Sequence, residues 1–193
     1  NGHPQTWPIA FPGMVAAAVF TWHGDAPSNL DLTPHINRLF FRDARKQAAS
    51  VLMELADVDR LIPLKVTNQS FLFNSLSQPV ADVKVRLAEC PAAAFDKVVA
   101  QCWEWEAALN KSHIDTPDSE WLHDELLLAV GLTRFAAQRC LAIQSSEGNF
   151  TLPAALRSDL SQLIGEFESV WVRRNRIGGL HESSARLRKL LDD

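Results

Sequence analysis

The stretch from Pro153 to Leu180 constrains the fold of this chain more strongly than any other. Its apolar side chains recur at steps of three and four residues: Leu156, Leu160, Leu163, Ile164, Phe167, Val170 and Trp171. Polar residues such as Asp159, Gln162 and Glu166 fill the opposite side. This periodicity is typical of an amphipathic α-helix with one buried face. The helix would be about 33 Å long, so the rest of the chain must supply a long apolar surface to cover it.

Both ends of this predicted helix carry boundary signals. Pro153 stands at the start, where the missing N–H of a proline leaves no hydrogen bond unmade, and a glycine pair at the far end can turn left-handed. Arginine and asparagine side chains in the last turn could bond the exposed carbonyl groups there. We therefore expect a structural motif that folds the final helix back, made by Trp171, Arg174, Asn175, Gly178 and Gly179.

Most of the chain after residue 27 shows the same helical periodicity, separated by short polar connections. Asp43 is placed to cap one of these helices. Residues 126–132, LLLAVGL, are apolar on every side, which marks their helix as the central one of the fold. Residues 28–193 are thus predicted to form a mainly α domain, a bundle of five to seven helices.

Residues 1–27 have a different character. Residues 14–22, MVAAAVFTW, form a continuous apolar run that is followed by His23, Gly24, Asp25, Ala26 and Pro27. A short run that is apolar on both faces fits a strand of a covered parallel sheet. We therefore expect residues 1–27 to be a remnant of a larger α/β unit, with Trp22 at the carboxyl end of the strand. At that position the indole could contact a ligand or serve only the structure.

Composition excludes some functions. The chain has 193 residues, 47% of them hydrophobic, and a net charge of −4. An acidic chain does not suit nucleic acid, which requires a basic face. No uninterrupted apolar stretch reaches the ~18 residues of a membrane helix. We expect no membrane or nucleic-acid partner, no cofactor and no metal. Three cysteines without paired spacing are expected to be buried, reduced thiols, which suggests the cytoplasm without establishing the compartment.

No catalytic set is apparent in the helical part. Asp124 and Glu125 are adjacent carboxylates, but neighbours on a helix point about 100° apart, so we expect them on a solvated face. His113, His123 and His181 lack the spacing of metal ligands and are expected at the surface or at helix ends. Three tryptophans lie on apolar helix stripes and are expected in the core: Trp103, Trp121 and Trp171.

Two groups of residues carry a resemblance to a known family. Near the amino end, Asn1-Gly2-His3-x-Gln5, Pro8-x-x-x-Pro12-Gly13 and Phe20-Thr21-Trp22 resemble the last part of the catalytic barrel of β-N-acetylhexosaminidases of glycoside hydrolase family 20. Trp171-x-x-Arg174-Asn175-Arg176-x-Gly178-Gly179-Leu180, with Ser183 and Arg186, resembles the helical region that follows the barrel. Phe41-x-Asp43 and Leu52-x-Glu54-Leu55 are similar to its first helices. The likeness is faint between residues 79 and 150.

The resemblance implies a parent enzyme with a (β/α)8 barrel that removes terminal N-acetylhexosamine with retention. In that family an Asp orients the acetamido nucleophile of the substrate and an adjacent Glu is the acid/base. Both would lie upstream of Asn1, so the chain is expected to lack the catalytic pair and to brace the barrel. Residues 1–27 would be the barrel end and residues 28–193 the C-terminal helical domain. Trp22, His3, Gln5 and Asp25 would contact the amino sugar. Where Ile177 stands we expect proline.

A second interpretation stays open. The chain could be a freestanding helical module that binds a partner protein, or an apolar ligand between its helices. The two interpretations differ at residues 14–22. The hydrolase predicts that these residues are an extended strand with unpaired edges or are poorly ordered, whereas the module predicts a helix packed in the bundle.

Overall fold

The computed structural model describes residues 6–23, 29–64 and 70–193. Within these ranges every regular element is helical and no strand is present. The α-helices are α1 (Phe11–Trp22), α2 (Thr33–Ile36), α3 (Gln47–Ala56), α4 (Phe71–Ser75), α5 (Val80–Leu87), α6 (Ala92–Leu109), α7 (Ser119–Ser145), α8 (Ala154–Arg174) and α9 (Leu180–Lys189). Short 3₁₀ or π segments accompany them: η1 (Trp7–Ala10), η2 (Asn37–Phe41), η3 (Val58–Leu61) and η4 (Leu190–Asp192). The mainly α fold class is confirmed.

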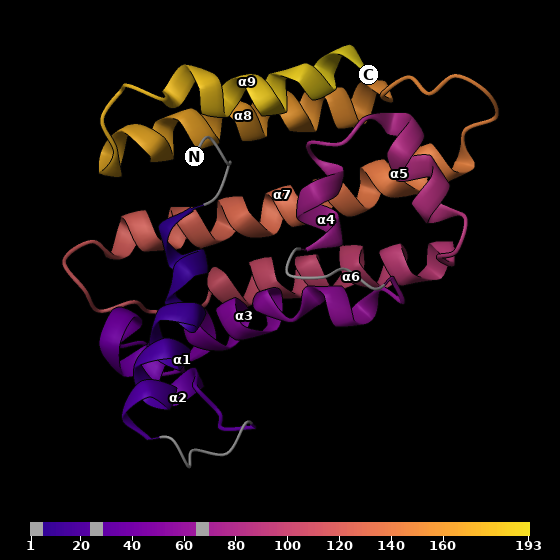
Figure 1. The fold of residues 1–193 in the computed structure, drawn as a ribbon. Coiled ribbons are helices and arrows are strands. Elements are labelled where there is room, and N and C mark those ends of the chain that lie inside the picture. The colour runs from indigo at the N-terminus through magenta and orange to yellow at the C-terminus, as the bar shows by residue number, and fades with distance from the viewer. Residues whose placement is uncertain (1–5, 24–28, 65–69) are drawn as a thin grey trace.

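The helix α7 is the centre of the bundle. The long helices α6, α7 and α8 lie side by side and run in alternating directions, with α9 outermost on α8 (Figure 1). Other elements, among them α3, α4, α5 and η1, also pack on α7. Its residues 126–132 are all buried or half-buried, as their uniform apolar character predicted. α7 is also long and apolar enough to cross a membrane, but 67% of its most apolar window is buried in the bundle, as befits a core helix.

α8 follows the predicted amphipathic pattern closely. Its apolar stripe is buried at Leu156, Leu160, Leu163, Ile164, Phe167 and Val170, and Trp171 is partly buried beside them. Part of this stripe faces α7 and part faces α9. Gly131 of α7 lies so close to α8 that a β-carbon on it would come within 2.8 Å of Leu163 Cδ2. The absence of that atom therefore sets how closely the two helices approach.

Residues 14–22 are helical, so the predicted strand is wrong and nothing in the described structure supports a barrel remnant. α1 begins at Phe11, with Pro12 in its first turn, and contains the alanines 16–18, which are strong helix formers. An extended segment would leave its backbone groups unpaired, because the described residues offer no strand beside it. A helix pairs them internally. A short apolar run has no periodicity that distinguishes the two structures.

α1 is attached to the bundle by one side only. Phe11 is 2% exposed and stacks on Phe40 with a centroid distance of 3.9 Å, and Val15 is also buried. Met14, Phe20 and Trp22 are exposed. The helix carries no charged residue, so the side that faces solvent is as apolar as the side that faces α2 and α3.

Asp43 connects three parts of the chain. Its side chain is buried and accepts hydrogen bonds from the backbone N–H groups of Arg45 at 3.0 Å, Ala48 at 3.2 Å and His113 at 3.3 Å. The predicted capping role is confirmed in a modified form. Lys46 is the residue that precedes α3, and Asp43 reaches the first turn of the helix from three residues further back.

Arg139 is a fully buried cation in α7. Its guanidinium donates to the carbonyl of Ser75 at 2.8 Å and to the carboxylate of Asp193 at 2.5 Å. A buried guanidinium is stable only when such partners compensate for lost hydration. Arg139 therefore links α4, α7 and the segment after α9.

Candidate functional site

The four predicted sugar contacts fall mostly outside the described structure. His3, Gln5 and Asp25 lie among the residues that the structure does not describe. Trp22 is the last residue of α1, and its side chain is 84% exposed. Its indole is thus free to contact a partner or ligand, although it ends a helix and not a barrel strand.

The predicted structural motif lies at the junction of α7, α8 and α9. Arg174 Nε donates to Glu125 Oε1 at 2.7 Å, and its Nη2 donates to Asp118 Oδ2 at 2.8 Å. The guanidinium also lies over the indole of Trp121, 5.5 Å from the ring centroid. Arg174 thus joins the end of α8 to two carboxylates, one in α7 and one directly before it. The partners of Arg174 are the side chains of Glu125 in α7 and of Asp118 directly before α7. They are not the carbonyl groups at the end of α8, which the sequence had suggested.

A second ion pair lies beside the first. Arg173 donates to Asp124 Oδ2 at 2.5 Å. Two adjacent carboxylates near the start of α7 thus meet two adjacent arginines at the end of α8. Arg173 and Arg174 lie in the last turn of α8, where cations are favoured by the helix dipole. We call Asp124, Glu125, Arg173 and Arg174 the α7–α8 clamp.

Glu125 departs from the sequence expectation. Asp124 is partly exposed, but Glu125 is only 2% exposed and one of its oxygens, Oε2, has no hydrogen-bond partner. Burial raises the pKa of the Glu125 carboxyl above its usual value, and the neighbouring Arg174 opposes that rise only in part. The expected solvated face is wrong for this residue. The sequence does not reveal which helix packs on α7, so it could not reveal the arginine that permits this burial.

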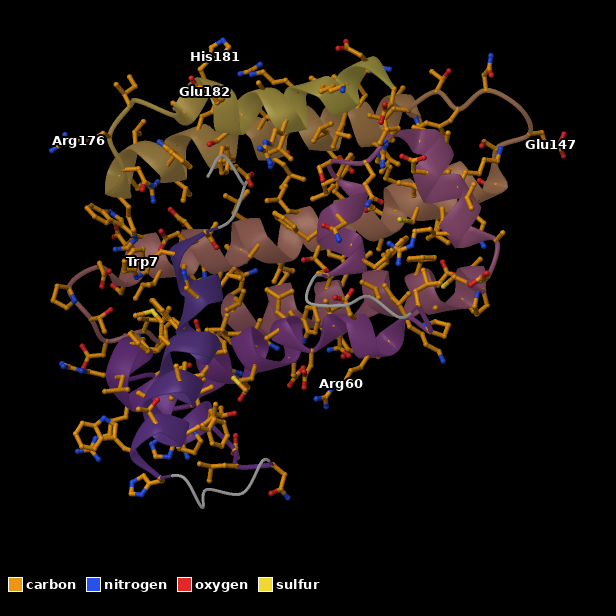
Figure 2. The ribbon with its side chains drawn as sticks, in the orientation of Figure 1. Trp7, Arg60, Glu147, Arg176, His181 and Glu182 are labelled. Carbon is orange, nitrogen blue, oxygen red and sulfur yellow. The ribbon has the colours of Figure 1, made fainter. Side chains whose placement is uncertain are left out.

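The exit turn from α8 uses the remaining motif residues. Asn175 Nδ2 donates to the carbonyl of Trp171 at 3.3 Å, and Trp171 Nε1 donates to the carbonyl of Arg176 at 3.0 Å. Gly179 has φ 88°, the left-handed conformation that glycine adopts without strain, and it precedes α9 directly. Gly178 is exposed and does not take a positive φ. After this turn α9 packs back onto α8. The side chains of Arg176, His181 and Glu182 project from this end of the bundle (Figure 2).

The tryptophans are less buried than expected. Trp103 is 52% exposed and Trp121 is 40% exposed, so the expectation that they lie in the core is wrong, and Trp171 is only partly buried. Instead Trp105, which lies at helical spacing from the buried Cys102 and Leu109, is 3% exposed and donates to Glu54 at 2.7 Å. Trp103 makes a cation–π contact at the surface, because the guanidinium of Arg134 lies 3.8 Å from its ring centroid.

A groove of about 520 Å³ lies between α6, α7 and α8. Its lining includes Leu127, Gly131 and Phe135 of α7, with carboxylates from all three helices around them. The residues of α8 at the groove, among them Asp159, Gln162 and Glu166, belong to its polar side, opposite the buried stripe. The sequence offers one indication of the groove, Gly165 on that polar side. Glycine in the middle of a helix lowers its stability, so its presence there points to a requirement other than helix formation.

The described residues offer no group of three or more histidine, cysteine or carboxylate side chains that could hold a metal ion. His123 contacts the carbonyl of Leu109 at 3.2 Å, at the end of α6, while His181 is exposed. All three cysteines are buried and unpaired, as expected. Burial raises the pKa of Cys102 to about 12 and that of Cys140 to about 11, so neither thiol is a ready nucleophile.

No family model matches the chain, and no curated protein or solved structure matches it significantly. What the chain does must therefore be inferred from its own residues.

Proposed function

We propose that this chain is the non-catalytic C-terminal helical region of a β-N-acetylhexosaminidase-like glycoside hydrolase. Its work would be to brace the catalytic barrel of the parent enzyme and to place Trp22 beside the amino-sugar site. The parent would supply the catalytic Asp and Glu. Residues 14–22 would contribute a helix to that brace and not a barrel strand.

The observation that carries the proposal is the exposure of Trp22. An indole that is 84% exposed at the end of an uncharged helix is costly in water and useful against a sugar face or an apolar protein surface. The adjacent carboxylates Asp124 and Glu125 have no catalytic role in this proposal. They are neutralised by Arg173 and Arg174 and hence do not form an acid/base pair of their own.

The proposal is tested on the product of the reading frame extended upstream of Asn1. We expect this longer protein to contain an Asp-Glu dipeptide at the end of an apolar strand and to hydrolyse chromogenic N-acetylglucosaminide. The chain of 193 residues alone should show no turnover. Trp22→Ala in the longer protein should lower kcat/KM by about tenfold, the loss of about 1.4 kcal/mol of transition-state stabilisation.

Trp7→Ala is the matched control, because Trp7 is 58% exposed and lies outside the residues of the resemblance. It should change kcat/KM by less than about twofold, well under 1 kcal/mol. An upstream sequence without the Asp-Glu dipeptide, or a Trp22→Ala variant with unchanged kinetics, would contradict the proposal.

A second candidate is a freestanding helical interaction module. The helical conformation of α1 favours it, since the module predicted a helix where the hydrolase predicted a strand. A start codon just before Asn1 would support the module against the hydrolase. A thermal-shift screen of ligands that range from polar to apolar would then identify what the module binds. A ligand that binds only the folded state raises Tm.

A further inference from the structure

α1 and the elements that it packs on form one end of the molecule. The helix contacts α2 and α3, and Phe11 stacks on Phe40 of η2. Figure 1 shows α1 and α2 across the bundle from α8 and α9. We call residues 6–23 and 29–46 the α1 unit. Its surface differs from that of the rest of the molecule in both apolar exposure and charge.

The solvent side of α1 is uncharged along its whole length. Four residues at helical steps are all exposed: Met14, Ala17, Ala18 and Thr21. Phe20 and Trp22 are exposed as well, and Trp7 is exposed at the other end of the continuous helical stretch Trp7–Trp22. Tryptophan is enriched where proteins meet the membrane–water interface, because its ring is apolar while its N–H group stays hydrated. The exposed side of α1 is therefore suited to the headgroup–acyl boundary of a bilayer.

The segment after α2 in the α1 unit is basic. Four exposed cations follow one another closely in it: Arg38, Arg42, Arg45 and Lys46. In the part of the chain that the structure describes, none of the four forms an ion pair. Of the two aspartates in the α1 unit, Asp43 is buried and accepts backbone N–H groups, so only Asp31 is exposed. The surface of the α1 unit therefore carries an excess of positive charge.

This local charge is opposite to that of the rest of the chain. Residues 1–46 contain four arginines or lysines and three aspartates, whereas residues 47–193 contain 15 arginines or lysines and 20 aspartates or glutamates. An anionic surface attracts the basic end of such a molecule and repels the remainder, so it orients the molecule. The attracted end is also the end at which α1 exposes its apolar side.

α1 is too short to cross a bilayer. Its 12 residues extend about 18 Å, whereas the hydrocarbon core is about 30 Å thick. The sequence expectation of no membrane partner was based on the length of the apolar stretches, which matters only for a spanning helix. A helix that lies in the interface needs an apolar side and nearby cations. The α1 unit provides both, from two adjacent segments.

We propose that the α1 unit binds the surface of an anionic phospholipid bilayer. The exposed side of α1 would lie at the headgroup–acyl boundary, and the cations of residues 38–46 would lie near the lipid phosphates. The proposal goes beyond the hydrolase assignment and does not depend on it, because it rests on Met14, Phe20 and cations that the assignment does not place at the sugar.

The test uses the whole chain and two kinds of vesicle, phosphatidylcholine alone and phosphatidylcholine with about one third phosphatidylserine. Flotation should show binding to the anionic vesicles that is about tenfold tighter or more, and the difference should decrease with added salt. Brominated phosphatidylcholine in the anionic vesicles should quench tryptophan fluorescence. Trp7→Phe with Trp22→Phe should remove most of this quenching while the vesicles remain bound.

Two double variants with an equal change of charge test the basic segment. Arg38→Gln with Arg42→Gln should weaken binding to the anionic vesicles by about tenfold or more. Arg60→Gln with Arg176→Gln should leave the affinity within about twofold, because these cations lie elsewhere and salt screens distant charges. Both control side chains project from other parts of the bundle (Figure 2).

A second pair of double variants tests the apolar side of α1. Met14→Gln with Phe20→Gln should weaken binding by about tenfold or more, because binding scales with the apolar area that enters the interface. Val172→Gln with Ile177→Gln removes two exposed apolar side chains at the end of α8 and after it, and should leave binding unchanged. Far-ultraviolet circular dichroism checks that all four double variants remain folded.

Four outcomes would overturn the proposal. The two kinds of vesicle could bind alike or not at all. Either double variant of the α1 unit could behave like its control. Anionic vesicles could bind without quenching, which would show that α1 stays outside the bilayer. Finally, polyglutamate in solution could bind with the same dependence on Arg38 and Arg42 while vesicles do not, which would assign the basic segment to an acidic protein. Trp22 is unchanged in the Met14 and Phe20 variant, so its failure leaves the kinetic test of the proposed function intact.

Discussion

The α7–α8 contact and the attachment of α1 are built from opposite chemistry. At the first, an apolar stripe on α8 is buried and the clamp of Asp124, Glu125, Arg173 and Arg174 fixes the relative position of the two helices. At the second, Phe11 and Val15 hold a helix that has no charged residue and therefore cannot form such ion pairs. The pattern of an amphipathic helix determines which side is buried, whereas a uniformly apolar helix leaves an apolar side exposed to solvent.

The largest effect is expected from Arg174→Met. The substitution leaves the Glu125 carboxylate buried without its cation, which costs about 3–5 kcal/mol for a buried pair. Urea unfolding at pH 7 measures the loss. Arg173→Met is the control, since Arg173 and Asp124 are partly exposed, and a pair of that kind contributes less than about 1 kcal/mol. Equal losses in the two variants would mean that the clamp does not depend on burial.

Phe11→Ala tests the attachment of α1. Removing a fully buried phenylalanine costs about 3 kcal/mol or more in a well-packed core, and the stacking on Phe40 is lost as well. Trp22→Ala on the same helix should change stability by less than about 0.5 kcal/mol, because its side chain is in solvent. Thermal unfolding of both variants compares the two sides of α1. A large loss in Trp22→Ala would show that its indole packs on this chain.

The two glycines on the facing helices should respond in opposite directions. Gly131→Leu places atoms where Leu163 already lies, and overpacking of this kind costs about 1–3 kcal/mol. Gly165→Ala faces open space and should stabilise α8 by about 0.5–1 kcal/mol, the difference in helix propensity. Chemical unfolding of each variant gives both values. A destabilised Gly165→Ala variant would contradict the open groove wall.

The smallest effect concerns pH. Burial raises the pKa of Glu125 in the folded protein, so the folded state keeps this proton to higher pH than the unfolded state does. The contribution of this group to stability is therefore greatest below its unfolded pKa, near 4.5, and is lost as pH rises through the folded value. Glu125→Gln should flatten this part of the profile, measured by urea unfolding between pH 4 and 8. Parallel profiles for the two proteins would contradict the raised pKa.

The structural features that could be predicted best from the sequence are those that depend on a local pattern. The stripe of α8, the turn at Gly179 and the enclosed character of α7 follow from spacing and residue type, which the chain displays within one or two turns. The strand prediction for residues 14–22 was wrong because a run with Thr21 as its one polar residue has no hydrophobic period. The burial of Glu125 could not be predicted because it depends on Arg174, 49 positions away. Local periodicity does not indicate which helices pack against each other. The groove arises in the same way, from three helices together.

Asp43 has a consequence for the motions of the molecule. One carboxylate holds the amide protons of Arg45, Ala48 and His113, which belong to two loops and one helix. If that carboxylate turns away, all three protons lose their acceptor in the same event. In deuterium oxide these amides should consequently exchange at one common rate, as a single opening unit that spans segments far apart along the chain.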